Sequence, residues 1–279
     1  MAVRPFDPVQ EILSSGRMLI GAPLLAAPMI IAILIPVLIV LAFGGFALFG
    51  ALTSQDALSN PDTIKDIFTP SLLVGLGLAA IVCVVLSLLS TGAVYGGSAD
   101  ALAGQPVDFG SLMTSALKHA GSIFVFYLII GGAGIVAELV IVLLALVSHG
   151  ILGALGFVVL IPAAIYAAFL LMYGLPAIVV GGKSPSSAML DSADLARANV
   201  GPTLILILAG FVLTIGASIV NLTFGLIPVL GLFLSLAAQA VCAAFIALFS
   251  VHFYSQLSGR LAIARAADTA SATPPPAAL

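Results

Sequence analysis

Three polar residues stand within otherwise apolar stretches of this sequence and are the first candidates for chemistry. Glu138 is the only charged residue between Gly121 and Gly182, and Asn221 and Gln239 lie in two later apolar stretches. No Lys or Arg lies in these stretches to neutralise a carboxylate. An acid in such surroundings is costly to bury and is frequently functional. We therefore take Glu138, Asn221 and Gln239 as a candidate polar site among apolar residues.

Two interpretations of this site stay open at the level of sequence. In the first, Asn221 lies at a depth comparable to that of Glu138 on a parallel helix and hydrogen-bonds to it as a structural contact. In the second, Glu138 serves a proton or cation pathway, which requires a second acid or a row of polar groups on the facing helices. Beyond Asn221 and Gln239, only scattered Ser and Thr are present. This scarcity favours the structural contact.

The other reactive residue types lack the spacing of known catalytic or metal sites. His119, His149 and His252 fall in separate segments, so a lone axial ligand is the remaining option for them. Cys83 and Cys242 have no CxxC spacing and are expected to pack as small apolar residues. No Ser-His-Asp set, HExxH pair or carboxylate pair is visible at catalytic spacing. The sequence therefore predicts no enzyme and no cofactor.

The composition indicates which kind of element must position these residues. Of the 279 residues, 62% are hydrophobic and only 7% are charged, whereas soluble domains carry roughly 25% charged residues. The mean hydropathy is +1.31. A net charge of −3 without a basic block argues against a nucleic-acid partner, and the low charge argues against disorder. The chain is expected to be a polytopic membrane protein in contact with the lipid bilayer.

The apolar intervals between charge clusters predict six transmembrane helices once the two longest intervals are divided at turn-forming residues, at Ser148–Gly150 and at Asn221–Pro228. A hydrocarbon core of about 30 Å requires about 20 helical residues, and the stretches do not alternate in the way that a membrane barrel needs. The fold class is therefore all-α, with three hairpins. We expect the spans at about 18–52, 71–97, 121–147, 151–181, 201–223 and 228–254, within a domain of residues 1–263, and a disordered Ala- and Pro-rich cytoplasmic tail at 264–279.

The distribution of Lys and Arg predicts the orientation of the chain. One side carries Arg4, Arg17, Lys118, Lys183, Arg197, Arg260 and Arg265, and the other carries Lys65 alone. Positive residues accumulate in short cytoplasmic loops. Both termini are therefore expected to be cytoplasmic, in a prokaryotic cytoplasmic (inner) membrane.

A helix-start signal precedes each predicted hairpin, at Asp7-Pro8, at Asp108 and at Ser184-Pro185. These signals predict three short helices that lie along the cytoplasmic interface, in three parallel repeats. In the third helix, residues 184–199, we expect an apolar side and a polar side. The apolar side is expected to carry Met189, Leu190, Ala193 and Leu195, and the polar side Asp191, Asp194 and Arg197.

Three segments resemble a family of six-span bacterial and archaeal membrane proteins. They are Leu175–Asn199 (LPAIVVGGKSP, then AMLDSADLARAN), Asp100–Val107 (DALAGQPV) and Phe253–Arg260 (FYSQLSGR). The family is related to the membrane domain of glycerophosphoryl diester phosphodiesterase and to the YciC-like uncharacterised inner-membrane proteins. In that enzyme the hydrolytic site belongs to a separate barrel domain. The resemblance therefore implies a six-span fold and no phosphodiesterase activity in this chain.

The function expected from the sequence is that of a non-catalytic accessory or scaffold protein of the membrane. Other membrane proteins would pack against its glycine-rich spans or its cytoplasmic interfacial helices, because small residues let helices approach closely in lipid. The alternative is a transporter or channel for a small or lipid-like solute that uses Glu138.

Overall fold

The computed structural model describes residues 8–45, 69–148, 151–224 and 230–272, and every regular element within these ranges is helical. Six helical stretches are long and apolar enough to cross a membrane, which confirms the predicted all-α polytopic class. They are Pro23–Phe43, Pro70–Leu102, Phe109–Val147, Ile151–Val179, Val200–Phe224 and Phe233–Gly259. Each overlaps one of the six expected spans, and the third begins at Phe109, well before its expected start at residue 121. Residues 46–52 of the first expected span and 228–229 of the last lie outside the described residues.

The helices and turns are, in chain order, α1 (Pro8–Gly21), the 3-10 turn η1 (Pro23–Ala26), α2 (Ala27–Val40), the π-helical turn η2 (Leu41–Gly45), α6 (Pro70–Leu102), α7 (Phe109–Val147), α8 (Ile151–Leu171), α9 (Gly174–Val179), α10 (Pro185–Ala198), α11 (Val200–Phe224) and α12 (Leu230–Ala272). Pro36 lies inside α2 without ending it, whereas Pro23 opens η1 after the break that follows α1.

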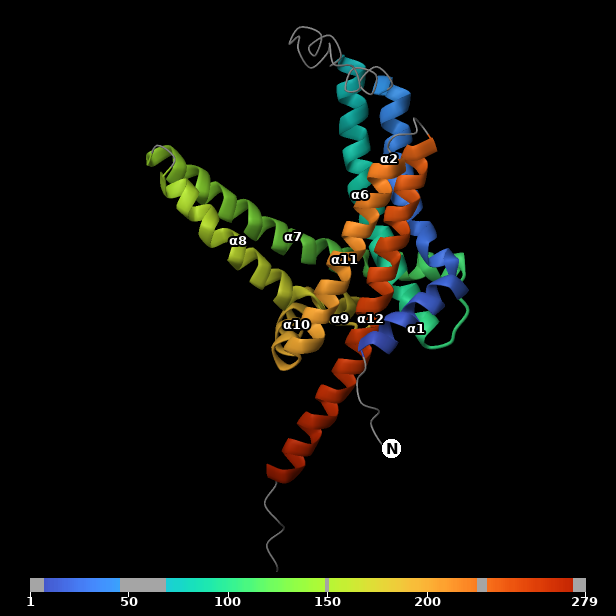
Figure 1. Cartoon of the computed structure of the whole chain (residues 1–279), viewed down its shortest axis with the longest axis vertical. Coiled ribbons are helices and arrows are strands. Elements are labelled where there is room, and N and C mark those ends of the chain that lie inside the picture. The colour runs from blue at the N-terminus through green and yellow to red at the C-terminus, as the bar shows by residue number, and fades with distance from the viewer. Residues whose placement is uncertain (1–7, 46–68, 149–150, 225–229, 273–279) are drawn as a thin grey trace, which may run out of the picture.

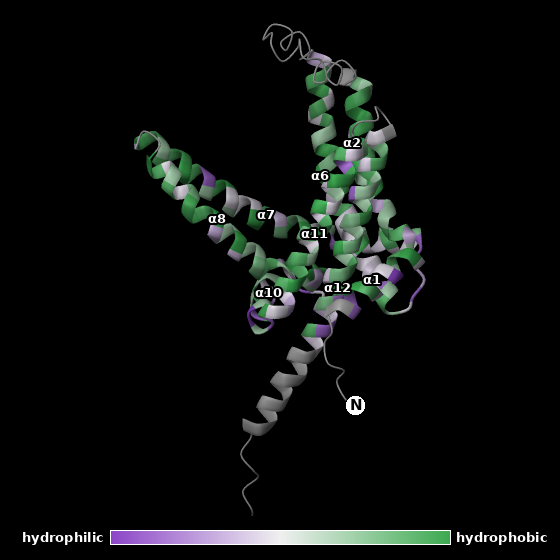
Figure 2. Cartoon of the chain, in the orientation of Figure 1, coloured by the Kyte–Doolittle hydropathy of each residue, from purple (hydrophilic) through white to green (hydrophobic). Residues whose placement is uncertain are grey.

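The helices form an upright bundle and a separate arm (Figure 1). The bundle contains α2, α6, α11 and α12, and α6 packs against both α2 and α12. The arm, defined here as residues 126–147 of α7 together with α8, leaves the bundle at a wide angle. The short helices α1, α9 and α10 lie at the end of the bundle from which the arm leaves, with α9 and α10 on the side of the arm and α1 on the other side of α12 (Figure 1), and we call this end of the molecule the base. Figure 2 shows apolar residues over most of the bundle and arm, with hydrophilic residues concentrated near the base.

A buried junction at the base joins the arm to the bundle. Tyr173 lies in the break between α8 and α9 and is fully buried, and its hydroxyl contacts the Thr203 hydroxyl of α11 at 3.1 Å. The Ser192 hydroxyl of α10 accepts from the Tyr173 backbone N–H at 3.0 Å and donates to the Leu170 carbonyl at 2.7 Å. Backbone groups exposed by a helix break need such partners. Ser192 therefore satisfies both sides of the break.

Glycines bring α6 and α7 into close contact. A Cβ atom at Gly92 would lie 3.1 Å from the Cα of Ala116, and one at Gly96 would lie 2.5 Å from the Cβ of Ser115. The Ser115 hydroxyl donates to the Gly92 carbonyl at 3.1 Å. Gly92 and Gly96 are spaced as in the small-xxx-small pattern that supports close helix packing in membranes. This spacing was visible in the sequence, but nothing there identified α7 as the neighbour.

The interfacial helices differ from one another in the structure. The first is separate, since α1 ends at Gly21 before the first span begins. The second is continuous with its span. Asp108 caps α7 as expected, with the Ser111 N–H donating to its carboxylate at 2.7 Å, but the helix then runs without a break to Val147. No proline interrupts this segment, so the helix hydrogen-bond ladder continues from the interface into the membrane.

The third interfacial helix, α10, buries a face that only partly overlaps the expected one. Leu195 is buried as predicted, and Asp194 and Arg197 are exposed as predicted. Leu190 is 71% exposed, so its assignment to the docked side is wrong. The buried residues of α10 are Ala188, Ser192, Leu195 and Ala196. They are separated by four, three and one residues and so share one face of the helix, on which Leu195 is the only large side chain.

The last helix is longer than expected. α12 extends to Ala272, so helical backbone covers residues 264–272 of the segment that the sequence assigns to a disordered tail. The rest of that segment, residues 273–279, lies outside the described residues.

Candidate functional site

The arm is the least buried part of the membrane-spanning structure. In the most apolar 18-residue stretch of Ile151–Val179, none of the residues is buried within the chain, and the share is 6% for Phe109–Val147. The corresponding share for Phe233–Gly259 in the bundle is 44%. Most residues of the arm therefore keep part of their surface exposed to whatever surrounds the protein.

Glu138 lies on this arm and is exposed. It is nine residues before Val147, the last residue of α7, which is about 14 Å along the helix at 1.5 Å per residue. This distance is about half of the thickness of a hydrocarbon core, which is about 30 Å. Within the described part of the chain, no ion pair or hydrogen bond engages its carboxylate. Glu138 is thus an exposed acid within a helix that is long and apolar enough to cross a membrane.

Asn221 and Gln239 lie elsewhere. The Asn221 side-chain oxygen accepts a hydrogen bond from the Ser235 hydroxyl, which joins α11 to α12. Gln239 is exposed on α12. The expected hydrogen bond between Glu138 and Asn221 is absent among the described residues, because the arm carries α7 away from α11 and α12 (Figure 1). Similar depth along two helices does not specify that the helices are neighbours, and the three residues do not form one site.

A cavity of about 640 Å³ lies where the arm diverges from the bundle. The arm contributes small side chains on both helices, including Ala133 and Ala137 of α7 and Ala164 and Ala168 of α8. The bundle side contributes the two polar lining residues, Tyr95 of α6 and Ser250 of α12, and the Ser250 hydroxyl donates to the Ile246 carbonyl of its own helix at 2.7 Å. Glu138 does not line this cavity. The alanines and glycines are visible in the sequence, but the sequence does not show that they line a cavity.

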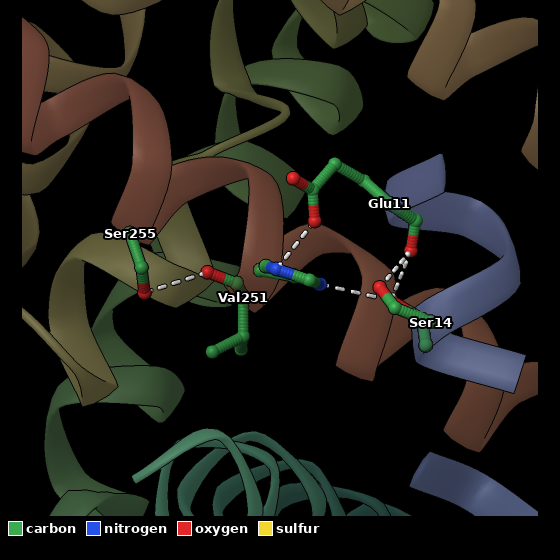
Figure 3. A network of polar contacts seen from close by, with 6 residues as sticks. Glu11, Ser14, Val251 and Ser255 are labelled. Atoms are coloured by element: carbon green, nitrogen blue, oxygen red, sulfur yellow. Dashed lines mark hydrogen bonds and ion pairs between the residues drawn. The ribbon is translucent and has the colours of Figure 1, made fainter. Parts of the chain in front are cut away.

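A second polar cluster, which the sequence analysis missed, fastens α1 to α12 (Figure 3). The His252 ring lies between two side chains of α1, with Nε2 2.6 Å from the Glu11 carboxylate and Nδ1 3.2 Å from the Ser15 hydroxyl. The Ser15 hydroxyl also donates to the Glu11 carbonyl at 2.9 Å. The spacing of four residues places Glu11 and Ser15 on one face of α1, which is the only signal that the sequence offered.

This cluster has the residue types of a nucleophilic triad, but a substrate cannot reach its serine. Ser15 is fully buried and His252 is 8% exposed, so the hydroxyl cannot meet a substrate. The arrangement instead satisfies the buried polar atoms of two helices, as buried polar groups require. We therefore assign the Glu11, Ser15 and His252 cluster to the docking of α1 against the last span.

Metal ligation finds no support in the described ranges. No group of three or more His, Cys, Asp and Glu side chains comes together there. His119 is buried on α7, His252 is engaged as above, and His149 lies outside the described residues. Cys83 is exposed and Cys242 is partly buried, and both are free thiols.

Comparisons with known proteins identify no relative of this chain. No family model, no curated protein and no solved structure matches the chain. The resemblance to six-span membrane proteins stays a prediction from the sequence.

Proposed function

We propose that this protein is a non-catalytic accessory protein of the membrane whose partner, a second membrane protein, packs against the arm over Glu138. The outward-facing carboxyl group of Glu138 carries the proposal. An acid exposed to hydrocarbon is costly, and such residues in membrane helices nearly always face a partner or a polar space. The described part of this chain provides neither, so a neighbouring protein is the natural source of the contact.

The helix face around Glu138 suits another membrane helix. Gly131, Ile135, Glu138 and Val142 recur at intervals of four, three and four residues and so share one face of α7. A Cβ atom at Gly131 would meet no other atom within 4 Å, so a second helix has room to approach closely there. Close approach at a glycine and one interhelical hydrogen bond are common features of helix association in lipid. The partner helix is expected to carry a donor such as Arg, Lys, Asn or Gln at the depth of Glu138.

The geometry favours this function over transport through Glu138. A pathway would need polar groups facing the carboxylate, but Asn221 is engaged by Ser235 on a different pair of helices. The cavity beside the arm has only Tyr95 and Ser250 as polar lining residues and excludes Glu138. We further propose, from the distribution of Lys and Arg, that the base faces the cytoplasm.

Co-purification from native membranes in mild detergent tests the proposal. We expect a defined membrane protein to accompany the wild-type chain and to be lost several-fold with Glu138→Leu. Gln239→Leu is the matched control, because it removes an exposed polar side chain from another span, and it should retain the partner. Glu138→Gln keeps hydrogen-bonding capacity and should retain part of the association. A wild-type protein that is reproducibly solitary, or equal recovery with Glu138→Leu, would contradict the proposal.

A further inference from the structure

We propose that the arm bends at a hinge that crosses both of its helices, at Gly131–Gly134 on α7 and at Pro162 on α8. Three of the four residues from Gly131 to Gly134 are glycines, and Pro162 lies inside α8 without ending it. Glycine and proline inside helices are the usual causes of a sharp bend. The hinge divides the arm into a proximal half next to the base and a distal half, defined here as residues 135–147 and 151–161.

The three glycines of α7 are not required for packing within the chain. A Cβ atom added at Gly131, Gly132 or Gly134 would meet no other atom within 4 Å. At Gly153, in the distal half, a Cβ atom would lie 3.0 Å from the Cα of Ala145, so that glycine brings the two helices together. Glycine weakens a helix because its backbone has more freedom to lose than that of other residues. The glycines on α7 therefore loosen the helix at one point and provide no contact within the chain in return.

Pro162 lies at the same level of the arm as these glycines. The two helices of the arm are antiparallel, and Gly156 of α8 lies against Ile141 of α7. Pro162 is six residues further along α8, and Ile135, directly after Gly134, is six residues back along α7, which is about 9 Å in the same direction on each helix. A proline inside a helix lacks the N–H for one hydrogen bond of the ladder. Both helices of the arm are thus weakened at one level.

Contact with the buried core ends where the hinge begins. In the proximal half, Phe126 belongs to the buried core of the base, and Ile130 of α7 and Phe169 of α8 pack against that core. Of the described residues from 131 to 168, none belongs to a buried cluster of the base or the bundle or packs against one. In the distal half, Ile141 is buried because it lies against α8. The distal half is therefore a helix pair that packs on itself, and segments with few buried contacts are those that move most readily.

The hinge determines which residues of the arm move together. Glu138 lies four residues beyond Gly134, so it moves with the distal half. Tyr173 and Ser192 lie on the other side of the hinge, in the buried junction, and stay in place. The hinge follows from the two helices of this chain alone and does not depend on the proposed partner. It also differs from a motion of the whole arm about the base, which would displace the proximal half as well.

Distances between spin labels, measured by double electron–electron resonance, test the hinge in the purified full chain in lipid nanodiscs. Cys83→Ala and Cys242→Ala remove the native thiols, and the labels are attached to pairs of introduced cysteines. In the proximal pair, Ile81→Cys with Leu128→Cys, the labels join α6 to the proximal half of the arm. In the distal pair, Ile81→Cys with Leu146→Cys, they join α6 to the distal half, and all three labelled positions are exposed. We expect a narrow distance distribution for the proximal pair and a several-fold wider one for the distal pair.

Stiffening α7 at the hinge should narrow the distribution of the distal pair. Each change from Gly to Ala favours the unbroken helix about fivefold, so Gly132→Ala with Gly134→Ala should reduce the bent conformations about 25-fold. The distribution of the distal pair should then become as narrow as that of the proximal pair. Gly216→Ala is the matched control, because its added methyl group also meets no atom within 4 Å but lies on α11, and it should leave both distributions unchanged.

Three results would overturn the proposal. A distal pair as narrow as the proximal pair in the parent protein would show that the arm does not bend. Equally wide distributions for the two pairs would place the motion at the base rather than at the hinge. A distal pair as wide in the variant with Gly132→Ala and Gly134→Ala as in Gly216→Ala would show that the glycines are not the hinge.

Discussion

Replacing Ser192 with Ala removes a single hydroxyl group but should destabilise the protein strongly. The hydroxyl is fully buried and holds two backbone groups at the break between α8 and α9, the Tyr173 N–H and the Leu170 carbonyl. Each buried group left without its partner costs about 1–3 kcal/mol. The better helix propensity of Ala returns about 0.5 kcal/mol. The expected loss in the free energy of unfolding is therefore about 1.5–5.5 kcal/mol.

Two further variants rank the contacts of this junction. Tyr173→Phe removes only the hydroxyl contact with Thr203, whose own hydroxyl still donates to the Asn199 carbonyl at 2.7 Å. This change should cost about 0.5–1.5 kcal/mol, the usual net value of one hydrogen bond. Ser187→Ala is the matched control on α10, because Ser187 is exposed, and it should change stability by less than about 0.5 kcal/mol.

Unfolding in mixed micelles by increasing SDS, followed by far-ultraviolet circular dichroism, measures these differences. Circular dichroism is chosen because the chain contains no Trp, so unfolding cannot be followed by tryptophan fluorescence. The expected order of destabilisation is Ser192→Ala, then Tyr173→Phe, then Ser187→Ala. If Ser192→Ala unfolded at the same SDS fraction as Ser187→Ala, the junction would not hold the arm in place, and the reasoning from buried partners would be refuted.

Three other perturbations test separate parts of the structure. Gly96→Ala inserts a methyl group into the contact with α7 and should cost about 1–3 kcal/mol, whereas Gly77→Ala meets no neighbour and should be neutral or stabilising in the same SDS titration. His252→Ala leaves a largely buried carboxylate of α1 without its partner and should speed proteolysis within α1; unchanged protection would show that the cluster does not hold this helix. A cysteine at Ser59 should react with an impermeant reagent from outside the cell and one at Ser186 should not, and the reverse pattern would overturn the assigned orientation.

The sequence predicted the membrane-spanning elements well because their signals are local. Four apolar stretches between charge clusters, two of them divided at turn-forming residues, are enough to place six helices, and Asp108 caps α7 by a contact with a residue only three positions away. Length, hydropathy and capping depend on neighbouring residues in the chain. They therefore appear in the sequence without knowledge of the fold.

Features that depend on which helices are neighbours could not be predicted. The pairing of Glu138 with Asn221 assumed that equal depth means proximity, and the divergence of the arm separates them. The docked face of α10 was misjudged at Leu190 because hydropathy alone ranks a leucine above Ser192, which the helix break at Tyr173 actually requires. The cluster of Glu11 with His252 joins residues 241 positions apart in the sequence, and no local pattern connects them.

Crosslinking from the Glu138 face within native membranes tests the proposed function most directly. A photoreactive amino acid at Val142, which is exposed and shares that face, should crosslink to one defined membrane protein, and the crosslink should disappear when Glu138→Leu is added. The same probe at Val84, an exposed position on α6, should give no such product. If Val142 crosslinked only to lipid, or if the protein crosslink survived Glu138→Leu, no partner would be held over Glu138 and the account of this protein as an accessory subunit would be contradicted.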